Sequence, residues 1–121
     1  MRNQQIADVR FMHFRVPAYR IGGETQGIEA RGGATFAYVE RDGQFLGAVS
    51  YCNPKDNFQR VYGCNKAEGR LVQLLNNPDL GDDDKYFVGF VQDFDPEDPN
   101  QAKKEWLGDI YSHMTHGLGY V

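Results

Sequence analysis

A tight turn between two strongly β-prone runs constrains the fold of this chain more than any other feature. The runs ATFAYVE and QFLGAVSY are rich in aromatic and β-branched residues, and the sequence Arg41-Asp42-Gly43 joins them. An Asp-Gly pair suits the positive φ angles that a tight hairpin turn requires. The sequence therefore predicts a β-hairpin over residues 34–51.

Two further segments have the composition of strands. Residues 9–16 (VRFMHFRV) carry apolar side chains on both alternating sets and end just before Pro17. Residues 85–94 (KYFVGFVQDF) have aromatic and β-branched side chains on both faces, a pattern that predicts a central strand. The stretch 22–33 is rich in glycine and predicts a loop or an irregular edge.

A capping box predicts the first helix, over residues 57–75. Asp56 offers an N-cap oxygen and Gln59 follows three residues later, so the helix is expected to begin at Asp56 or Asn57. Gly63 and Gly69 are costly inside a helix, which indicates an irregular first turn or the close approach of another group. The expected apolar stripe comprises Val61, Cys64, Ala67, Leu71, Leu74 and Leu75.

A second capping box predicts another helix, over residues 99–115. Asp98 is the expected N-cap, Pro99 suits the first helical position, and Gln101 completes the box. Gly117 is a suitable terminator. The broad apolar face consists of Ala102, Trp106, Leu107, Ile110, Tyr111 and Met114.

These elements predict a single α+β domain over residues 1–121, with a small antiparallel or mixed sheet and two helices packed on one face. Hydrophobic residues make up 40% of the chain and aromatic residues 13%, which excludes wholesale disorder. Because the chain has neither a membrane-spanning apolar run nor an export signal, we expect a cytoplasmic protein with both cysteines reduced and no membrane partner.

Negative charge is concentrated in the second half of the chain. Between positions 79 and 98, only Lys85 offsets eight carboxylates. Such a surface repels phosphate backbones and attracts basic partners. The alternative interpretation is that these acidic residues keep the surface soluble and complement the dipole of the following helix. The expected contact surface, helped by exposed Tyr86 and Tyr111, comprises Asp79, Asp82, Asp83, Asp84, Asp93, Asp95, Glu97 and Asp98.

The sequence predicts no metal site, no cofactor and no catalytic activity. Cys52, Cys64, His113 and His116 are zinc-type ligands, but their spacing differs from that of zinc ribbons and fingers. The acidic tract lacks the glycine and the closing glutamate of a calcium loop. A cysteine paired with a histidine is conceivable, but no nucleophile elbow, phosphate-binding glycine loop or zincin helix is present.

Basic and aromatic residues are interleaved around the first predicted helix. Guanidinium and ammonium groups pair with phosphates while an aromatic ring stacks on a base. The alternative interpretation is a solvated helix face opposite the leucines. The candidate ligand-binding residues are Phe58, Arg60, Lys66 and Arg70, accompanied by Asn53, Lys55 and Tyr62.

The same segment resembles a family of small phage proteins. Its form is C-x-x-x-D-x-F-x-R-x-x-G-x-x-x-A-x-G-R-L, covering about twenty residues from Cys52 to Leu71. It is similar to the phage anti-Thoeris family, which sequesters cyclic ADP-ribose signals and holds their phosphates with arginines. The resemblance implies a phosphate-binding role for Arg60 and Arg70. The chain differs at Cys64, where the family has an arginine.

Together these features predict a phage-type anti-defence protein that acts by binding rather than catalysis. We expect an anti-CRISPR-like inhibitor whose acidic surface binds a basic host defence or nucleic-acid-handling protein, with no direct binding of nucleic acid. An alternative is a sponge for a cyclic nucleotide-type signal, using Arg60 and Arg70; a second is a phage structural or housekeeping component. A homodimer formed through the strand edge at 9–16 or through an exposed Trp106 also remains open.

Overall fold

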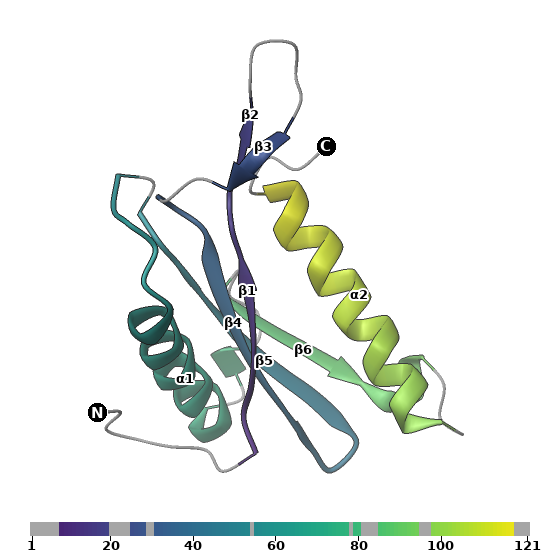
Figure 1. Ribbon diagram of the computed structural model, residues 1–121. Coiled ribbons are helices and arrows are strands. Elements are labelled where there is room, and N and C mark those ends of the chain that lie inside the picture. The colour runs from purple at the N-terminus through teal and green to yellow at the C-terminus, as the bar shows by residue number, and fades with distance from the viewer. Residues whose placement is uncertain are drawn as a thin grey trace.

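The computed structural model describes residues 8–19, 25–28, 31–53, 55–77, 79–80, 85–94 and 98–117, which form an α+β fold (Figure 1). The elements in chain order are β1 (Arg10–Phe14), β2 (Pro17–Tyr19), β3 (Thr25–Ile28), β4 (Ala34–Arg41), β5 (Gln44–Tyr51), α1 (Arg60–Asn76), β6 (Tyr86–Phe90), the 3-10 helix η2 (Val91–Asp93) and α2 (Pro99–Gly117).

The predicted hairpin forms the centre of the main sheet. Strands β4 and β5 pair from Ala34 opposite Tyr51 down to Arg41 opposite Gln44. Asp42 and Gly43 make the turn with φ angles of 51° and 78°, the positive values expected of this turn type. The hairpin at 34–51 is therefore confirmed.

The main sheet is antiparallel, with four strands in the order β1-β4-β5-β6, and β2 and β3 pair separately as a small ribbon (Figure 1). Two expectations need correction. Residues 25–28 form strand β3 within the predicted loop 22–33. The predicted central strand at 85–94 is an edge strand that ends at Phe90 and continues as η2.

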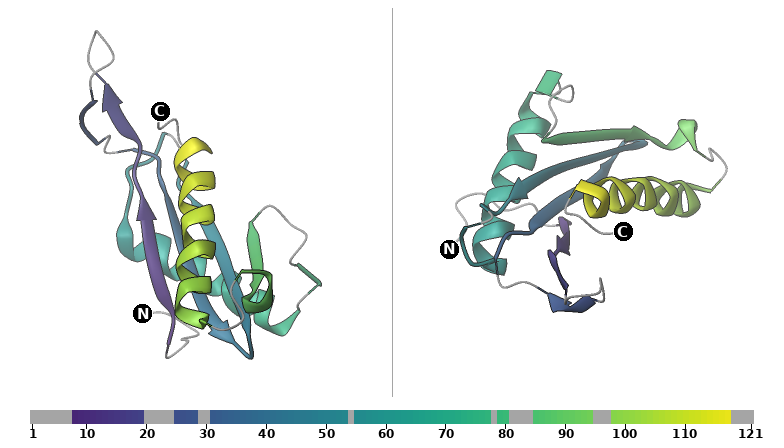
Figure 2. Two further views of the ribbon diagram at one scale, coloured as in Figure 1. Left: turned by 90° about the vertical axis from the view of Figure 1, so that its right-hand side faces the viewer. Right: turned by 90° about the horizontal axis from the view of Figure 1, so that it is seen from above.

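The two helices lie on opposite faces of the main sheet, not on one face as expected (Figures 1 and 2). Because side chains alternate along a strand, Ala37 and Leu46 face α1, whereas Phe36 and Phe45 pack with α2 residues. A sheet covered on both sides has apolar residues on both faces even in its edge strands. This arrangement explains why β6 has the composition of a central strand.

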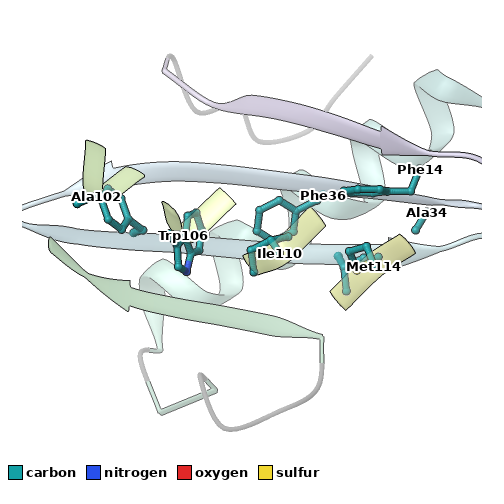
Figure 3. Packing of buried hydrophobic residues seen from close by; sticks show 9 residues of the cluster. Phe14, Ala34, Phe36, Ala102, Trp106, Ile110 and Met114 are labelled. Atoms are coloured by element: carbon teal, nitrogen blue, oxygen red, sulfur yellow. The ribbon is translucent and has the colours of Figure 1, made fainter. Parts of the chain in front are cut away.

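An aromatic layer fills the space between the sheet and α2 (Figure 3). The Trp106 ring stacks on Phe45 at 5.3 Å between centroids and lies 5.7 Å from Phe36. Glycines leave room for these rings, because a Cβ at Gly47 would lie 2.1 Å from Phe36 Cζ and one at Gly89 would lie 2.6 Å from Trp106 Cδ1. Trp106 is only 4% exposed, which confirms its place on the predicted apolar face and excludes the alternative of an exposed tryptophan at a dimer interface.

Helix α1 begins later than the capping box predicts. Its first residue is Arg60, and its N-cap Gln59 makes no side-chain capping hydrogen bond. Asp56 and Asn57 remain outside the helix because their backbone contacts residues 31–32 instead: Gly32 N–H donates to Asp56 O at 3.1 Å, and Arg31 bridges Asn57.

Helix α1 packs through a narrower stripe than expected. Ala67, Leu71 and Leu74 are buried, whereas Val61 is 74% exposed. Gly63 lies against the sheet. Val61 is about 200° away from Gly63 around the helix axis, so it faces away from the sheet. Gly63 is explained by close approach, because a Cβ there would lie 2.4 Å from Thr35 Oγ1.

Helix α2 follows its sequence pattern closely. The Asp98 carboxylate accepts hydrogen bonds from the backbone N–H groups of Asn100 and Gln101 at 3.1 and 3.2 Å, which confirms the N-cap. Ala102, Ile110 and Met114 are buried, and Tyr111 remains 54% exposed. Within the described part of the chain, we find no helix with the length and apolar character needed to cross a membrane.

Candidate ligand cavity at the start of helix α1

A cavity of about 590 Å³ opens where the end of the hairpin meets the start of α1. This volume falls within the range typical of small-molecule sites. Its wall combines aromatic rings, hydroxyls, amides, one ammonium group and one carboxylate. The lining residues are Thr35, Ser50, Tyr51, Cys52, Asn53, Asp56, Asn57, Phe58, Gln59, Tyr62, Gly63 and Lys66.

The segment between β5 and α1 supplies much of this wall, and its own polar groups hold it in place. The Asn53 side chain accepts a hydrogen bond from Lys55 N–H at 2.9 Å, and Asp56 N–H donates to Asn53 O at 2.9 Å. Cys52 N–H donates to Gly33 O at 2.9 Å. The segment is thus a folded loop tied to residues 31–33.

The Phe58 ring is fixed by contacts from β1 and its flanks. The Arg15 guanidinium lies 4.5 Å from the ring centroid, and the His13 ring meets it edge-on at 5.8 Å. On another side is Gly33, which has a φ of 95° and whose Cβ, if present, would lie 3.0 Å from Phe58 Cδ2. A half-buried aromatic ring is therefore held at the cavity wall beside a cation.

Positive charge collects at this end of α1. The first N–H groups of an α-helix have no intrahelical partner, and the first turn of α1 contains no acidic residue that would offset the helix dipole. Lys66 Nζ lies 5.5 Å from the Tyr62 ring centroid, and both side chains are exposed on the cavity side of the helix.

The cavity includes some of the predicted ligand-binding residues and omits others. Phe58 and Lys66 line it, whereas Arg60 and Arg70 do not. Arg70 Nη1 donates to Val49 O at 2.7 Å, just beyond the last pairing of β5 with β6 at Ala48. The Arg70 guanidinium is thus engaged with the backbone of β5.

A hydroxyl pair in the wall was missed by the sequence interpretation. Thr35 and Ser50 are directly opposed in the β4–β5 ladder and are both buried. The Asp-Gly turn fixes this register, and Thr35 and Ser50 are equally far from the turn. The sequence could therefore have predicted that these two hydroxyl residues are paired.

The acidic tract is described only in part. Asp79, Asp93 and Asp98 are exposed, but they lie on either side of β6 in the chain, and Asp98 caps α2. Tyr86 is only 9% exposed, and its hydroxyl donates to Gln73 Oε1 at 3.2 Å, so the expectation that it is exposed is wrong. The remaining acidic positions, namely Asp82, Asp83, Asp84, Asp95 and Glu97, lie outside the described residues.

The zinc-type ligands do not assemble in the described part of the chain. Neither Cys52 nor Cys64 forms a disulfide, and the described residues contain no group of three or more metal-type side chains. The exposed His113 ring packs edge-on against Phe87 at 5.5 Å.

A different pair of residues does come together. Cys64 Sγ lies 3.8 Å from His13 Nε2, and His13 Nδ1 lies 3.1 Å from Thr35 Oγ1. Burial, followed by the positive charges of Arg60 and Arg15, lowers the pKa of His13. The imidazole is therefore biased toward its neutral form.

Comparison with protein-family models, curated proteins and solved structures finds no match to this chain.

Proposed function

We propose that this protein acts by binding without catalysis, and that its ligand is a small phosphorylated molecule of the nucleotide class held in the α1 cavity. The observation that carries this proposal is the lining, in which the rings of Phe58 and Tyr62 and the ammonium of Lys66 share a space of about 590 Å³ with hydroxyl and amide groups. A ring stacks on a base, a cation pairs with phosphate, and amides bind the polar edges of the base.

The charge distribution supports a phosphorylated ligand. Lys66 lies in the wall, and the uncapped positive end of α1 adjoins it. Asp56 is the carboxylate of the wall, and carboxylates accept hydrogen bonds from ribose hydroxyls in other nucleotide sites. Base, sugar and phosphate thus each have a complementary group in one cavity.

The biological setting we propose is phage anti-defence, in which the protein sequesters a cyclic nucleotide-type immune signal in the cytoplasm of an infected cell. The support is the resemblance of the segment from Cys52 to Leu71 to the anti-Thoeris family, since part of that segment lines the cavity. Phe58 and Lys66 are the proposed contacts from the predicted set, with Arg60 adding charge nearby.

The test is thermal unfolding followed by Trp106 fluorescence with AMP, ADP, ADP-ribose and cyclic ADP-ribose. We expect at least one of them to stabilise the protein by about 2.7 kcal/mol at a hundredfold excess over its dissociation constant. The Lys66→Met variant keeps the aliphatic stem but removes the charge, so it should weaken binding at least about tenfold. Lys104→Met, an exposed change on α2, is the matched control. The proposal is refuted if no nucleotide shifts the midpoint or if both variants bind alike.

A second candidate function is inhibition of a basic host protein through the acidic residues. The observation that favours it is the exposure of Asp79, Asp93 and Asp98. Reversing charge at the neighbouring positions with the triple change D82K/D83K/D84K should abolish capture of a salt-sensitive host partner and leave nucleotide binding intact. Capture that survives the triple change contradicts this candidate, and Asp109→Lys on α2 is the control.

A further inference from the structure

A thiol, an imidazole and a hydroxyl form a chain of contacts between β1, β4 and α1. Cys64 Sγ lies 3.8 Å from His13 Nε2, and His13 Nδ1 lies 3.1 Å from Thr35 Oγ1. Thr35 is fully buried, so its hydroxyl holds the imidazole in one orientation. This order of groups is that of a nucleophile, a base and a residue that orients the base.

The fold imposes this geometry. His13 and Thr35 are directly opposed in the β1–β4 ladder. Gly63 lets α1 approach Thr35 so closely that a Cβ would meet Thr35 Oγ1 at 2.4 Å, and this contact brings the next residue, Cys64, to the imidazole. The Phe58 ring packs edge-on against the His13 ring at 5.8 Å and limits its rotation.

Two guanidinium groups set the electrostatics of the pair. After the larger effect of burial, Arg60 at the start of α1 and Arg15, the residue that follows β1, both act on His13. Together with burial, their positive charge favours a neutral imidazole at His13, which accepts a proton. The same charges raise the local concentration of small anions.

The other cysteine has the opposite surroundings. Cys52 Sγ lies 3.6, 3.5 and 3.7 Å from the carbonyl oxygens of Asn53, Asp56 and Asn57. Cys52 therefore serves as an internal reference cysteine, whose sulfur contacts carbonyl oxygens rather than an imidazole.

We propose that Cys64 is a nucleophilic cysteine and a site of covalent modification by small anionic carbon electrophiles of the α,β-unsaturated carboxylate class, with His13 as the general base. In the addition, Cys64 Sγ forms a bond to the β-carbon, and its proton passes to His13 Nε2. The π electrons of the C=C bond move to the α-carbon, which then takes the proton from His13. This reaction goes beyond ligand binding in the cavity, with which it shares Thr35.

The test uses iodoacetate and iodoacetamide as probes, and peptide mass spectrometry to follow each cysteine separately at pH 7. Alkylation forms the S–C bond and releases iodide, and the thiol proton goes to His13 and then to solvent. We expect Cys64 to react at least about tenfold faster than Cys52, because the His13 imidazole beside Cys64 Sγ accepts the thiol proton. We also expect the ratio of the iodoacetate rate to the iodoacetamide rate to be higher at Cys64 than at the thiol of free glutathione, because only iodoacetate is anionic.

Three variants make the test specific. His13→Gln should slow Cys64 alkylation to the level of Cys52, and Arg60→Gln should lower the ratio of iodoacetate to iodoacetamide rates. Arg10→Gln, at the opposite end of β1, is the matched control and should change neither. Equal rates for the two cysteines in the unaltered protein overturn the proposal, whether or not the His13 variant folds. An unchanged Cys64 rate in folded His13→Gln overturns the role of His13.

Discussion

Adding one methyl group at Gly47 should destabilise the fold through a single identified contact. A Cβ at this position of β5 would lie 2.1 Å from Cζ and 2.6 Å from Cε1 of Phe36, far inside van der Waals distance. Phe36 is fully buried and packs against Tyr38, Phe87 and Trp106, so its ring has little room to move. Overpacking of this kind costs about 1–3 kcal/mol, and we expect Gly47→Ala to fall in the upper part of that range.

The assay is urea unfolding followed by the fluorescence of Trp106, which is the only tryptophan of the chain and is buried in the same layer. Thermal unfolding gives a second readout: for a domain of 121 residues, a loss of 1 kcal/mol in the free energy of unfolding lowers the thermal midpoint by about 4 °C. A loss of about 2–3 kcal/mol therefore lowers it by about 8–12 °C.

A double-mutant cycle with Phe36→Leu isolates the contact. Leucine removes the ring edge that the new methyl group meets, so Gly47→Ala should cost less than about 1 kcal/mol in that background. Gly43→Ala is not a suitable control, because Gly43 has a positive φ; Gly108→Ala in α2 is suitable, because no atom lies within 4 Å of its added Cβ. If Gly47→Ala costs the same with Phe36 and with leucine at that position, the steric argument is wrong.

Three further predictions concern α2, α1 and the His13 site. Asp98→Ala removes an oxygen that accepts two backbone N–H groups and should cost about 1 kcal/mol in urea unfolding. Gly69→Ala should stabilise the protein by about 0.5–1 kcal/mol, because nothing lies within 4 Å of the added Cβ and alanine favours helix. The folded-state pKa of His13 is lowered by burial and by Arg60 and Arg15. The contribution of His13 to the free energy of unfolding should therefore be complete above its unfolded-state pKa of about 6.5. This contribution should be lost as the pH falls from about 6.5 through the folded-state pKa.

Each of these predictions has a control and a contrary outcome. Asp109→Ala, an exposed change in the middle of α2, should be nearly neutral, and equal effects at positions 98 and 109 would contradict the capping role. A destabilised Gly69→Ala variant would mean that α1 is packed differently at this position. For the pH profile, His13→Gln should flatten the slope below about pH 6.5. If the slope persists in the folded His13→Gln variant, groups other than His13 cause the pH dependence of stability.

Local chemistry determined the central hairpin and the start of α2, and the sequence alone predicted both. The Asp-Gly turn specifies both the hairpin and its register, because positive φ angles are needed at two adjacent residues and the pairing of residues 34–51 follows from their position. The Asp98 side chain and its neighbours likewise specify the start of α2. Phe58 and Lys66, two of the predicted ligand-binding residues, line the same cavity.

Tertiary packing decided where those elements go and which residues meet. The late start of α1 depends on contacts of Asp56 and Asn57 with residues 31–32, and these distant partners outweigh a local capping box. Helix periodicity places Trp106 on the apolar face of α2, but only the folded structure decides that this face covers the side of the sheet opposite α1. The approach of Cys64 to His13 joins residues 51 positions apart, and only the folded sheet and helix bring them together.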